Sequence, residues 1–569
     1  MKEMRSNKRR NENRSRLISG VYSFLLSVAI LFGARLDSVE NVDIRDVTLW
    51  LQLVALGIIF AGTVRLLWLL LDSAGKMGRK GSGKLSNIIT RVIKKTGRYE
   101  DVLTFFFLIL CWLPVLLAVY PGFFVYDAQD EYIQVATRVF STHHPLVHVL
   151  LLGGLICGVH KLTDSYNLGI ACYMVFQMAL AAGVFTFLFS YLRKKKVSCV
   201  LRLIGMIWLG LFPTVVMFTL CSAKDALFTL ALLLLLVCLL EMGTEEMFFE
   251  SKGWQVLFVL SGMGMMLLRN NGFYAFMVMI PLLLLVRKTR RRRLLFLAVC
   301  AAAGCLLING GLKAALHADD SEYQELLTVP IQQLARTYKY APETFSGEDR
   351  EILYEVLNEE ALSLYTPRLS DPVKYRFDNE AFAGDKGKYA KLWLRVGMKK
   401  PLIYLNAWWM TSYGFWYPDM VINVYGGNTV FTFTYKDNSY FGYEVEQPGV
   451  RESKIPWLDE VYRKLSLEVW KEKVPVVSWL FSPGAMFWIY AFLFAWLLNN
   501  RRYELLYPFL PIFLIWLTVL LGPTYLPRYV LFFWYCLPLF LAIAWMGCNS
   551  SVQDFALAAK SVRMCKFDQ

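Results

Sequence analysis

The chain has 569 residues, of which 56% are hydrophobic and only 18% are charged, and its mean hydropathy is +0.42. Soluble domains carry about 25% charged residues, and the apolar residues here form blocks long enough to cross a hydrocarbon core of ~30 Å, which excludes an ordinary soluble enzyme. The net charge of +15 does not indicate nucleic acid, because the excess lies in short segments between apolar blocks, such as 193–196 and 287–293.

The apolar blocks predict an all-α polytopic membrane protein of about twelve transmembrane helices with short connections. The expected helices lie near 17–34, 48–71, 101–120, 167–192, 202–220, 226–242, 254–268, 273–286, 294–312, 479–498, 505–522 and 529–547. The blocks at 254–268 and 273–286 are shorter than the ~20 residues of a straight span, so they must be tilted, extended into their flanks or partly re-entrant.

The basic segments predict the orientation of these helices. If residues 1–16 lie in the cytoplasm, the basic segments 76–98, 193–196, 287–293 and 501–502 all fall on the cytoplasmic side. We therefore expect a protein of the cell membrane with both termini in the cytoplasm. The expected domains are the basic N-terminus 1–16, an N-terminal transmembrane domain 17–312 with its first outer loop at 121–166, an outer segment 313–478, C-terminal transmembrane helices 479–547 and a tail 548–569.

The predicted outer face includes one apolar block, 145–159, and one long polar segment, 313–478. The apolar block 145–159 could be a further span, but it would then place 193–196 outside, so we expect a helix that lies at the outer surface or dips into the membrane. The outer segment 313–478 has 20 Lys and Arg against 24 Asp and Glu and contains no cysteine, which excludes a disulfide framework there. We expect it to be mixed and mainly helical, with one helix near 348–364.

An acidic motif follows the third predicted span. Tyr120-Pro121-Gly122 opens the first outer loop, and the carboxyl side chains of Asp127, Asp130 and Glu131 come directly after it. A partly desolvated carboxylate at a membrane surface can act as a general base. Asp127 is the first candidate for such a base and Asp130 the second, while a solvated acidic loop is the structural alternative.

Histidines form the second motif of this loop. His143, His144 and His148 are spaced so that two of them can share one helix face. The pair His144 and His148 could bind a divalent metal ion together with an aspartate, which is the only cofactor that the sequence suggests. His143 and His144 could also contact a substrate, or simply form hydrogen bonds at the membrane interface.

Three cations stand at the outer ends of predicted helices. Lys224 and Arg269 lie between closely spaced apolar blocks, where ionisable side chains are usually functional, and Arg528 stands at the start of the last span. They are candidates for binding a phosphate. The amides of Asn270 and Asn271, together with Gln332, Gln333 and Arg336 of the outer segment, are further candidates for substrate contact. Tight turns, an interfacial anchor and an amphipathic helix are the structural alternatives.

Taken in order, the motifs YPG…YD at 120–127, HHP at 143–145, AKD at 223–225, RNNG at 269–272, VPIQQLAR at 329–336 and LPRY at 526–529 resemble the GT-C superfamily of membrane glycosyltransferases. More narrowly, the chain looks like an uncharacterised bacterial multi-spanning family within that group. The resemblance implies a GT-C-like fold, a base in the first outer loop at Asp127, and a lipid phosphate held by Lys224, Arg269 and Arg528. The metal dependence of the superfamily varies, so a metal site stays open.

These motifs lead to one preferred function and three alternatives. The preferred one is transfer of a sugar from a polyprenyl-phosphate donor to a cell-envelope acceptor on the outer face, with inversion at the anomeric carbon. The expected partners are that donor and membrane lipid, without nucleic acid. A flippase or transporter for lipid-linked sugars is the first alternative. The predicted span interiors hold almost no Asp or Glu, and only Arg65 stands out, which counts against ion-coupled transport but not against a flippase. A polysaccharide ligase or polymerase and a structural scaffold are the others.

Overall fold

The structure, a computed structural model, describes residues 2–77, 99–287, 289–422, 445–467 and 474–548. Every regular element within these residues is a helix, and pairing of extended segments is limited there to three isolated β-bridges. The prediction of an all-α fold is therefore confirmed for the described part of the chain. The predicted tail lies outside that part, except for Cys548.

Among the described residues, seven helices are long and apolar enough to cross a membrane. They are α1 (Lys2–Val39), α2 (Val47–Met77), α4 (Glu100–Ala118), α6 (Leu146–Thr163), α7 (Tyr166–Lys194), α10 (Asp225–Thr244) and α13 (Arg291–Leu316). An eighth is counted if α8 (Cys199–Leu211) and α9 (Pro213–Thr219), which meet at a bend of 57°, form one span. Pro213 has no backbone N–H to continue the first helix, which explains the break.

Five further apolar helices have 10–17 residues, which is shorter than a straight span requires. They are α11 (Lys252–Leu268), α12 (Asn270–Val286), α24 (Pro483–Asn499), α25 (Phe509–Val519) and α27 (Leu537–Cys548). Local breaks limit four of them: Arg269 is extended (φ −152°, ψ 136°) between α11 and α12, Pro483 begins α24, and Pro508 precedes α25. Helix length alone therefore does not reach the predicted twelve spans.

The outer segment folds around a hydrophobic cluster of its own, which includes Leu353, Leu392 and Val396. Its helices are α14 (Thr328–Tyr340), α15 (Gly347–Val356), α16 (Glu359–Ser363), α17 (Asp371–Lys374), α18 (Asn379–Gly384), α19 (Lys386–Lys399) and α20 (Pro401–Ser412). The single helix expected near 348–364 is instead split into α15 and α16. The split occurs because the Asn358 side chain caps α16 by accepting a hydrogen bond from the Ala361 N–H.

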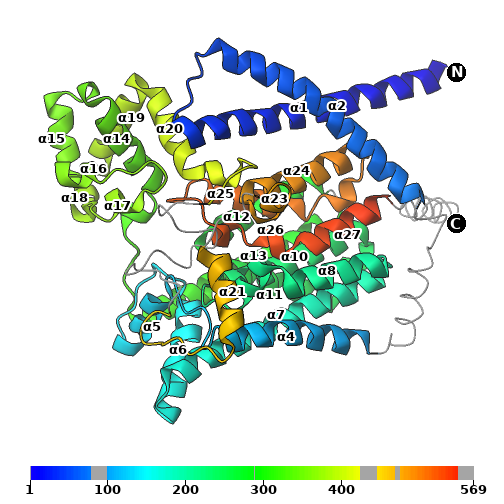
Figure 1. Cartoon of the computed structure of the whole chain (residues 1–569), viewed down its shortest axis with the longest axis horizontal. Coiled ribbons are helices and arrows are strands. Elements are labelled where there is room, and N and C mark those ends of the chain that lie inside the picture. The colour runs from blue at the N-terminus through cyan, green and yellow to red at the C-terminus, as the bar shows by residue number, and fades with distance from the viewer. Residues whose placement is uncertain (1, 78–98, 288, 423–444, 468–473, 549–569) are drawn as a thin grey trace.

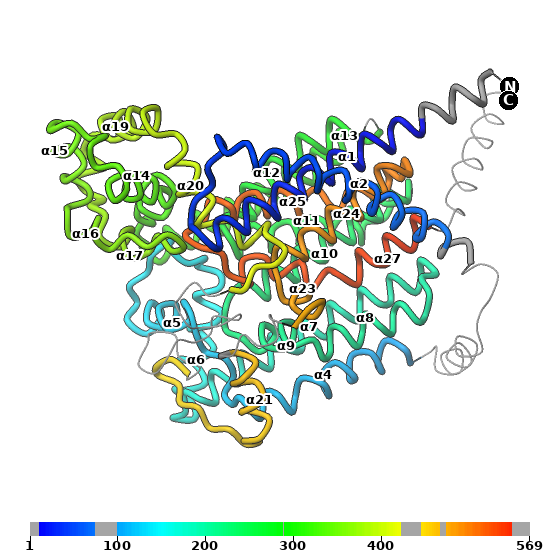
Figure 2. The backbone as a smooth tube through the Cα atoms, turned by 45° about the horizontal axis from the view of Figure 1, so that its top comes forward, coloured from blue at the N-terminus to red at the C-terminus, as the bar shows by residue number. Residues whose placement is uncertain are grey.

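The apolar helices form one bundle whose two ends carry different segments (Figure 1). The helices α14–α19 lie at one end, together with α5 (Ala128–Thr137) and α6, while the start of α1 and the end of α27 lie at the other. Figure 2 shows the same separation from a second direction. Helix α10 is the inner helix, because 78% of its apolar window is buried against 17% for α2.

The apolar block 145–159 forms α6, which passes the length and composition criteria for a span. Both views place α6 beside α5 at the end of the bundle. The prediction that it lies on or dips into the membrane surface stays a prediction. The remaining α-helices are α21 (Pro456–Leu467), α23 (Val477–Phe481) and α26 (Phe532–Tyr535), and the 3₁₀-helix η6 (Pro527–Val530) precedes α26.

Candidate active site at the α5 end of the bundle

A short backbone pairing brings two distant loops together at the end of the bundle that carries α5. The Phe123 N–H donates to the Leu220 carbonyl (2.9 Å), and the Ser222 N–H donates to the Phe123 carbonyl (2.9 Å). These two bonds align the segment that leads to Asp127 with the segment that leads to Lys224. This backbone pairing therefore holds Asp127 and Lys224 close to each other.

Four charged side chains meet at this place. Lys224 Nζ lies 2.8 Å from Asp127 Oδ2 and 3.5 Å from Glu131 Oε1, and Arg528 Nη1 lies 3.4 Å from the same Asp127 oxygen. The side chains of Lys224 and Arg528 are 13% and 11% exposed, so water screens these charges weakly. The result is a largely buried cluster in which two cations share one carboxylate.

The Tyr529 ring connects the third cation to this cluster. The Arg528 guanidinium lies 5.0 Å from the centroid of the Tyr529 ring and 4.4 Å from that of Tyr126. Arg269 lies 5.1 Å from the Tyr529 centroid and forms a short ion pair with Asp225. These are distances at which a ring face attracts a cation. Arg269 therefore stands one aromatic ring away from Arg528, and it does not touch Asp127 directly.

A buried series of hydrogen-bonded side chains holds Glu131 in the cluster. Glu131 forms a short contact with Nδ1 of His148, and His148 Nε2 lies 2.8 Å from the Tyr173 hydroxyl. That hydroxyl lies 3.1 Å from Gln177 Oε1, and the Gln177 amide donates to the carbonyls of residues 218, 219 and 221. Because buried polar groups require partners, this series fixes the Glu131 carboxylate that faces Lys224.

The two candidate bases have opposite electrostatic surroundings. Burial alone would raise the pKa of Asp127, but Arg528 and Lys224 outweigh it and hold that pKa well below its usual value. Burial, followed by the charge of Asp127, raises the pKa of Asp130 above its usual value. Burial and the nearby Lys224 lower the pKa of His144 to about 3, so that its imidazole is neutral. Asp130 is therefore the better proton acceptor of the two aspartates.

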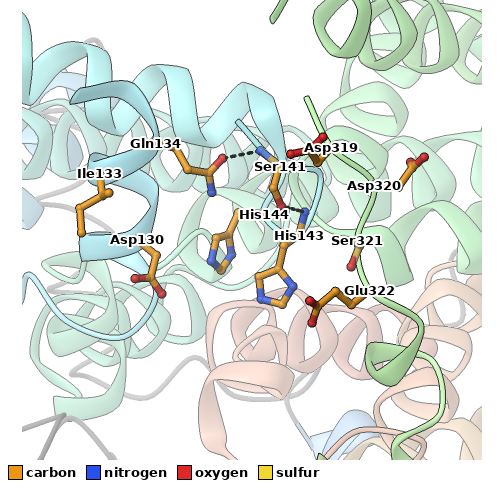
Figure 3. A pocket seen from close by; sticks show the side chains of 10 residues that line it. All are labelled: Asp130, Ile133, Gln134, Ser141, His143, His144, Asp319, Asp320, Ser321 and Glu322. Carbon is orange, nitrogen blue, oxygen red and sulfur yellow. Dashed lines mark hydrogen bonds between the residues drawn. The ribbon is translucent and has the colours of Figure 1, made fainter. Parts of the chain in front are cut away.

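Asp130 also lines an open cavity of about 500 Å³ beside the cluster (Figure 3). One wall carries Asp130, Ile133, Gln134, Ser141, His143 and His144. The other wall carries Asp319, Asp320, Ser321 and Glu322, which lead from α13 into the outer segment. His144 joins the two parts of the site, because its side chain lines the cavity and its Nδ1 lies 3.0 Å from Lys224 Nζ.

The histidines do not assemble a metal site with the neighbouring carboxylates. Within the described residues, no group of three or more His, Cys, Asp or Glu side chains could hold a metal ion together. Both ring nitrogens of His148 are already engaged, by Glu131 and by Tyr173. The suggested pair of His144 and His148 is thus better described as part of the hydrogen-bonded support of Lys224.

Arg269 is followed by the two candidate amides, at the start of α12. Asn270 is exposed, and the buried Oδ1 of Asn271 has no hydrogen-bond partner. Since a buried polar atom without a partner is unfavourable, Asn271 is available to a ligand group that donates a hydrogen bond. The structure therefore keeps both amides beside Arg269 without giving either a contact to Asp127 or Lys224.

The candidates of the outer segment are engaged elsewhere. Gln332 and Gln333 donate from their side-chain amides to the carbonyls of Thr366 (2.6 Å) and Tyr404 (3.2 Å). Arg336 donates to the Tyr365 hydroxyl (2.9 Å) and to the carbonyl of residue 40 (2.6 Å). All three side chains are buried within these contacts. These hydrogen bonds hold α14 in place, while the buried Oε1 of Gln332 has no partner, so the substrate contacts expected for the three residues stay a prediction.

A family described as "Family of unknown function (DUF6020)" matches residues 132–554. The chain belongs to this family. No curated protein and no solved structure matches the chain. The DUF6020 match contains the histidines and all three cations, but it begins directly after Asp127, Asp130 and Glu131. The carboxylates of the cluster thus lie just outside the matched region.

Several members of this site in the DUF6020 chain are not apparent as candidates in the sequence. Tyr173 and Gln177 lie inside an apolar block, where only the polar amide of Gln177 could have signalled a buried contact. Glu446 lies far along the chain, but its N–H donates to the Phe124 carbonyl (2.9 Å). Burial, followed by the charge of Asp130, raises the pKa of Glu446 to about 7. Nothing in its local sequence indicates this position.

Proposed function

We propose that this protein is a GT-C-like glycosyltransferase that moves a sugar from a polyprenyl-phosphate donor to a cell-envelope acceptor on the outer face of the membrane. The observation that carries the proposal is the approach of Lys224 and Arg528 to one oxygen of Asp127, at 2.8 and 3.4 Å, directly beside the cavity that contains Asp130. A phosphate-binding region and a candidate base are thus neighbours.

The cations would bind the phosphate of the donor. Lys224 and Arg528 are nearly buried and already converge on an anion, which is the arrangement that a phosphate oxygen requires. In the unliganded protein Asp127 supplies that negative charge. An incoming phosphate would share the cations with Asp127, and Arg269 would extend the positive region past Tyr529. Cations placed at the leaving oxygen stabilise the charge that develops there.

The base of the proposed reaction is Asp130 rather than the first candidate, Asp127. An acceptor hydroxyl in the cavity would give its proton to the Asp130 carboxylate while its oxygen bonds to the anomeric carbon. The bond from that carbon to the phosphate oxygen breaks at the same time. Its electron pair stays on the oxygen, so the products are the glycosylated acceptor and polyprenyl phosphate. Attack from the opposite side inverts the anomeric carbon.

The membrane arrangement proposed for this reaction has about twelve spans. Six of the seven long helices, the bent pair α8 and α9, and the shorter helices α11, α12, α24, α25 and α27 would be embedded, while the remaining long helix, α6, would lie at the outer surface. Both termini would lie in the cytoplasm of a cell-membrane protein. The α5 end of the bundle, with the candidate site and the helices α14–α19, would then face outward, where lipid-linked donors are used.

The test is turnover of a defined donor by the purified full chain in detergent micelles. Wild-type protein is given polyprenyl-phosphate sugars and an oligosaccharide acceptor, and release of polyprenyl phosphate is measured. We expect Asp130→Asn to lower the rate about 100-fold or more. Asp127→Asn should mainly change the KM for the donor, because it alters the charge beside Lys224 and Arg528 and leaves Asp130 in place. Asp164→Asn is the matched control, because the Asp164 side chain is fully exposed at the end of α6.

Other outcomes of this assay would point to the remaining functions. Donor binding without any release of polyprenyl phosphate by the wild type would overturn sugar transfer and favour a flippase. Transfer only to a polymeric glycan would indicate a ligase or polymerase, whose chemistry is the same. A larger loss in Asp127→Asn than in Asp130→Asn, with unchanged donor KM, would return the role of base to Asp127.

A further inference from the structure

The cavity beside the charged cluster has rigid, hydrogen-bonded walls. The Thr142 N–H donates to the Asp319 carbonyl (2.8 Å), and the Asp319 N–H donates to the Phe140 carbonyl (2.9 Å). The Ser321 N–H donates to the Thr142 hydroxyl (3.0 Å). A small hydrophobic cluster that includes Phe140 and Ala318 lies next to these bonds. None of these bonds uses a carboxylate of the cavity, so the two walls stay joined when those carboxylates are changed.

The charge of this cavity is opposite to that of the neighbouring cluster. Four carboxylates line it, and none of the described lining residues is Lys or Arg. Asp320 has a salt bridge with Lys313 (2.5 Å). In the described part of the chain, no salt bridge involves Asp130, Asp319 or Glu322. The cavity thus retains about three negative charges that its own walls do not balance.

The polar groups of the cavity suit a saccharide. Carboxylates accept hydrogen bonds from hydroxyl and amino groups, while the His143 ring and the Ser321 side chain add mixed donors and acceptors. His144 is neutral and faces the Lys224 ammonium through Nδ1, so its proton is on Nε2 and that nitrogen donates. The side chain of His144 is only 5% exposed, which fixes this donor at the boundary between the cavity and the cationic cluster.

We propose that this cavity is the acceptor subsite and that it selects a hydroxyl-rich acceptor without negative charge, favouring one with a free amino group. The inference rests on the proposed function, since it assigns the acceptor side of the same site. The donor phosphate and the acceptor are then sorted by charge: the anion binds at Lys224 and Arg528, and the cationic or neutral sugar binds between Asp130 and Glu322. An anionic saccharide is rejected by the unbalanced carboxylates.

The test is equilibrium binding of three soluble probes to the full chain in detergent micelles. The probes are a trisaccharide of glucosamine, its N-acetylated neutral counterpart and a trisaccharide of uronic acid, measured by saturation-transfer NMR and calorimetry. We expect affinity in the order amine, neutral, uronic acid, with about a tenfold or larger difference between the first and the last at low salt. The difference should shrink at 0.5 M salt, because the cavity is open to solvent.

A charge-neutralising variant tests whether the carboxylates of the cavity cause the preference for the amine probe. Asp319→Asn combined with Glu322→Gln should reduce the preference for the amine probe to about threefold or less. Both side chains are exposed, and the hydrogen bonds of Asp319 with the opposite wall are made by its backbone, so the variant should fold normally. Asp164→Asn, an exposed carboxylate of α6, should leave the order unchanged. Equal or tighter binding of the uronic acid probe, no binding of any probe, or a preference that the double variant retains would overturn the inference.

The acceptor inference and the proposed function fail in different ways. If the amine preference is present and depends on Asp319 and Glu322 but no polyprenyl phosphate is released, the glycosyltransferase proposal fails and the charge selection stands. If donor turnover is measured with Asp130 as the base but the three probes bind equally well, the acceptor inference alone is wrong. Measuring probe binding and carrier release on the same preparations separates the two results.

Discussion

Lys224 and Asp127 are 97 positions apart in the chain, yet Nζ of Lys224 lies 2.8 Å from Oδ2 of Asp127. Neither side chain is more than 27% exposed. The pair forms because the backbone pairing around Phe123 and Cys221 sets the two loops side by side. It is the contact on which the rest of the cluster depends, since Arg528, Glu131 and His144 all face one of its two members.

Removal of Lys224 should therefore destabilise the protein as well as inactivate it. Lys224→Ala leaves the carboxylates of Asp127 and Glu131 without their nearest cation, and we expect the free energy of unfolding to fall by about 3 kcal/mol. Combining it with Asp127→Asn should restore most of that stability without restoring sugar transfer. Denaturant unfolding and carrier release measure the two effects. Full stability of Lys224→Ala would show that the pair is not formed in the folded protein.

The buried hydrogen bonds that link Glu131, His148 and Tyr173 should make these residues energetically coupled. His148→Ala leaves the buried Oε2 of Glu131 without a partner and should cost about 2–3 kcal/mol, whereas Tyr173→Phe removes one neutral hydrogen bond and should cost about 1 kcal/mol. Because the two residues share a bond, the double variant should cost less than the sum. If the two losses of stability simply add in a double-mutant cycle, His148 and Tyr173 do not share this hydrogen bond.

The shared ring of Tyr529 should matter for anion binding through its face, not through its hydroxyl. Tyr529→Leu removes the ring contact of Arg269 and Arg528, and we expect the affinity for inorganic pyrophosphate to fall about five- to tenfold. Tyr529→Phe keeps the ring and should stay within about twofold of the wild type. Calorimetric titration distinguishes the two variants. An equal loss in both would assign the effect to the Tyr529 hydroxyl, which lies 3.3 Å from Arg528.

Gly272 sets the position of Arg269 through close helix packing. A Cβ at Gly272 would come within 2.4 Å of the Met265 carbonyl oxygen and 2.9 Å of the Phe228 ring, so that α11 and α12 would have to separate. Gly272→Ala should cost about 2 kcal/mol and lower carrier release. Gly310→Ala is the matched helical control, because nothing lies within 4 Å of the added carbon. Comparable thermal unfolding of both variants would contradict this account.

The free energy of unfolding should depend on pH through Glu446, whose pKa is raised to about 7. Between the usual pKa of about 4.5 and the folded value of about 7, the folded protein holds a proton at Glu446 that the unfolded chain releases. Stability linked to this group should therefore fall as pH rises from 5 to 7 and stay constant above that. After allowance for solvent screening, Glu446→Gln should gain about 1 kcal/mol at pH 8 and nothing at pH 5. Unfolding of both proteins at the two pH values measures the difference. A gain of equal size at pH 5 would exclude the titration of Glu446 as its cause.

Much of the fold was predictable because apolar blocks and proline breaks are local properties of the sequence. The blocks at 226–242 and 294–312, for example, match α10 and α13 closely. The number of spans was not decided in this way. The prolines at 483 and 508 make α24 and α25 shorter than the predicted blocks 479–498 and 505–522, whereas α11 and α12, which meet at the extended Arg269, are about as short as hydropathy predicts. In the outer segment, the cap at Asn358 split a helix that the pattern of Leu and Glu made continuous.

For the candidate site, too, the sequence predicted some features and only the tertiary structure decided the others. The sequence by itself determined that Asp127, Lys224, Arg269 and Arg528 are exceptional, because charged side chains beside apolar helices require a partner or a ligand. Only the tertiary structure decided which partners they have: it gave Asp127 two cations, left Asp130 facing a cavity, and engaged Gln332 and Arg336 in holding α14. The physical reason is that a pKa or an anion site depends on charges within a few ångströms in space, and those charges come from residues that are far apart along the chain.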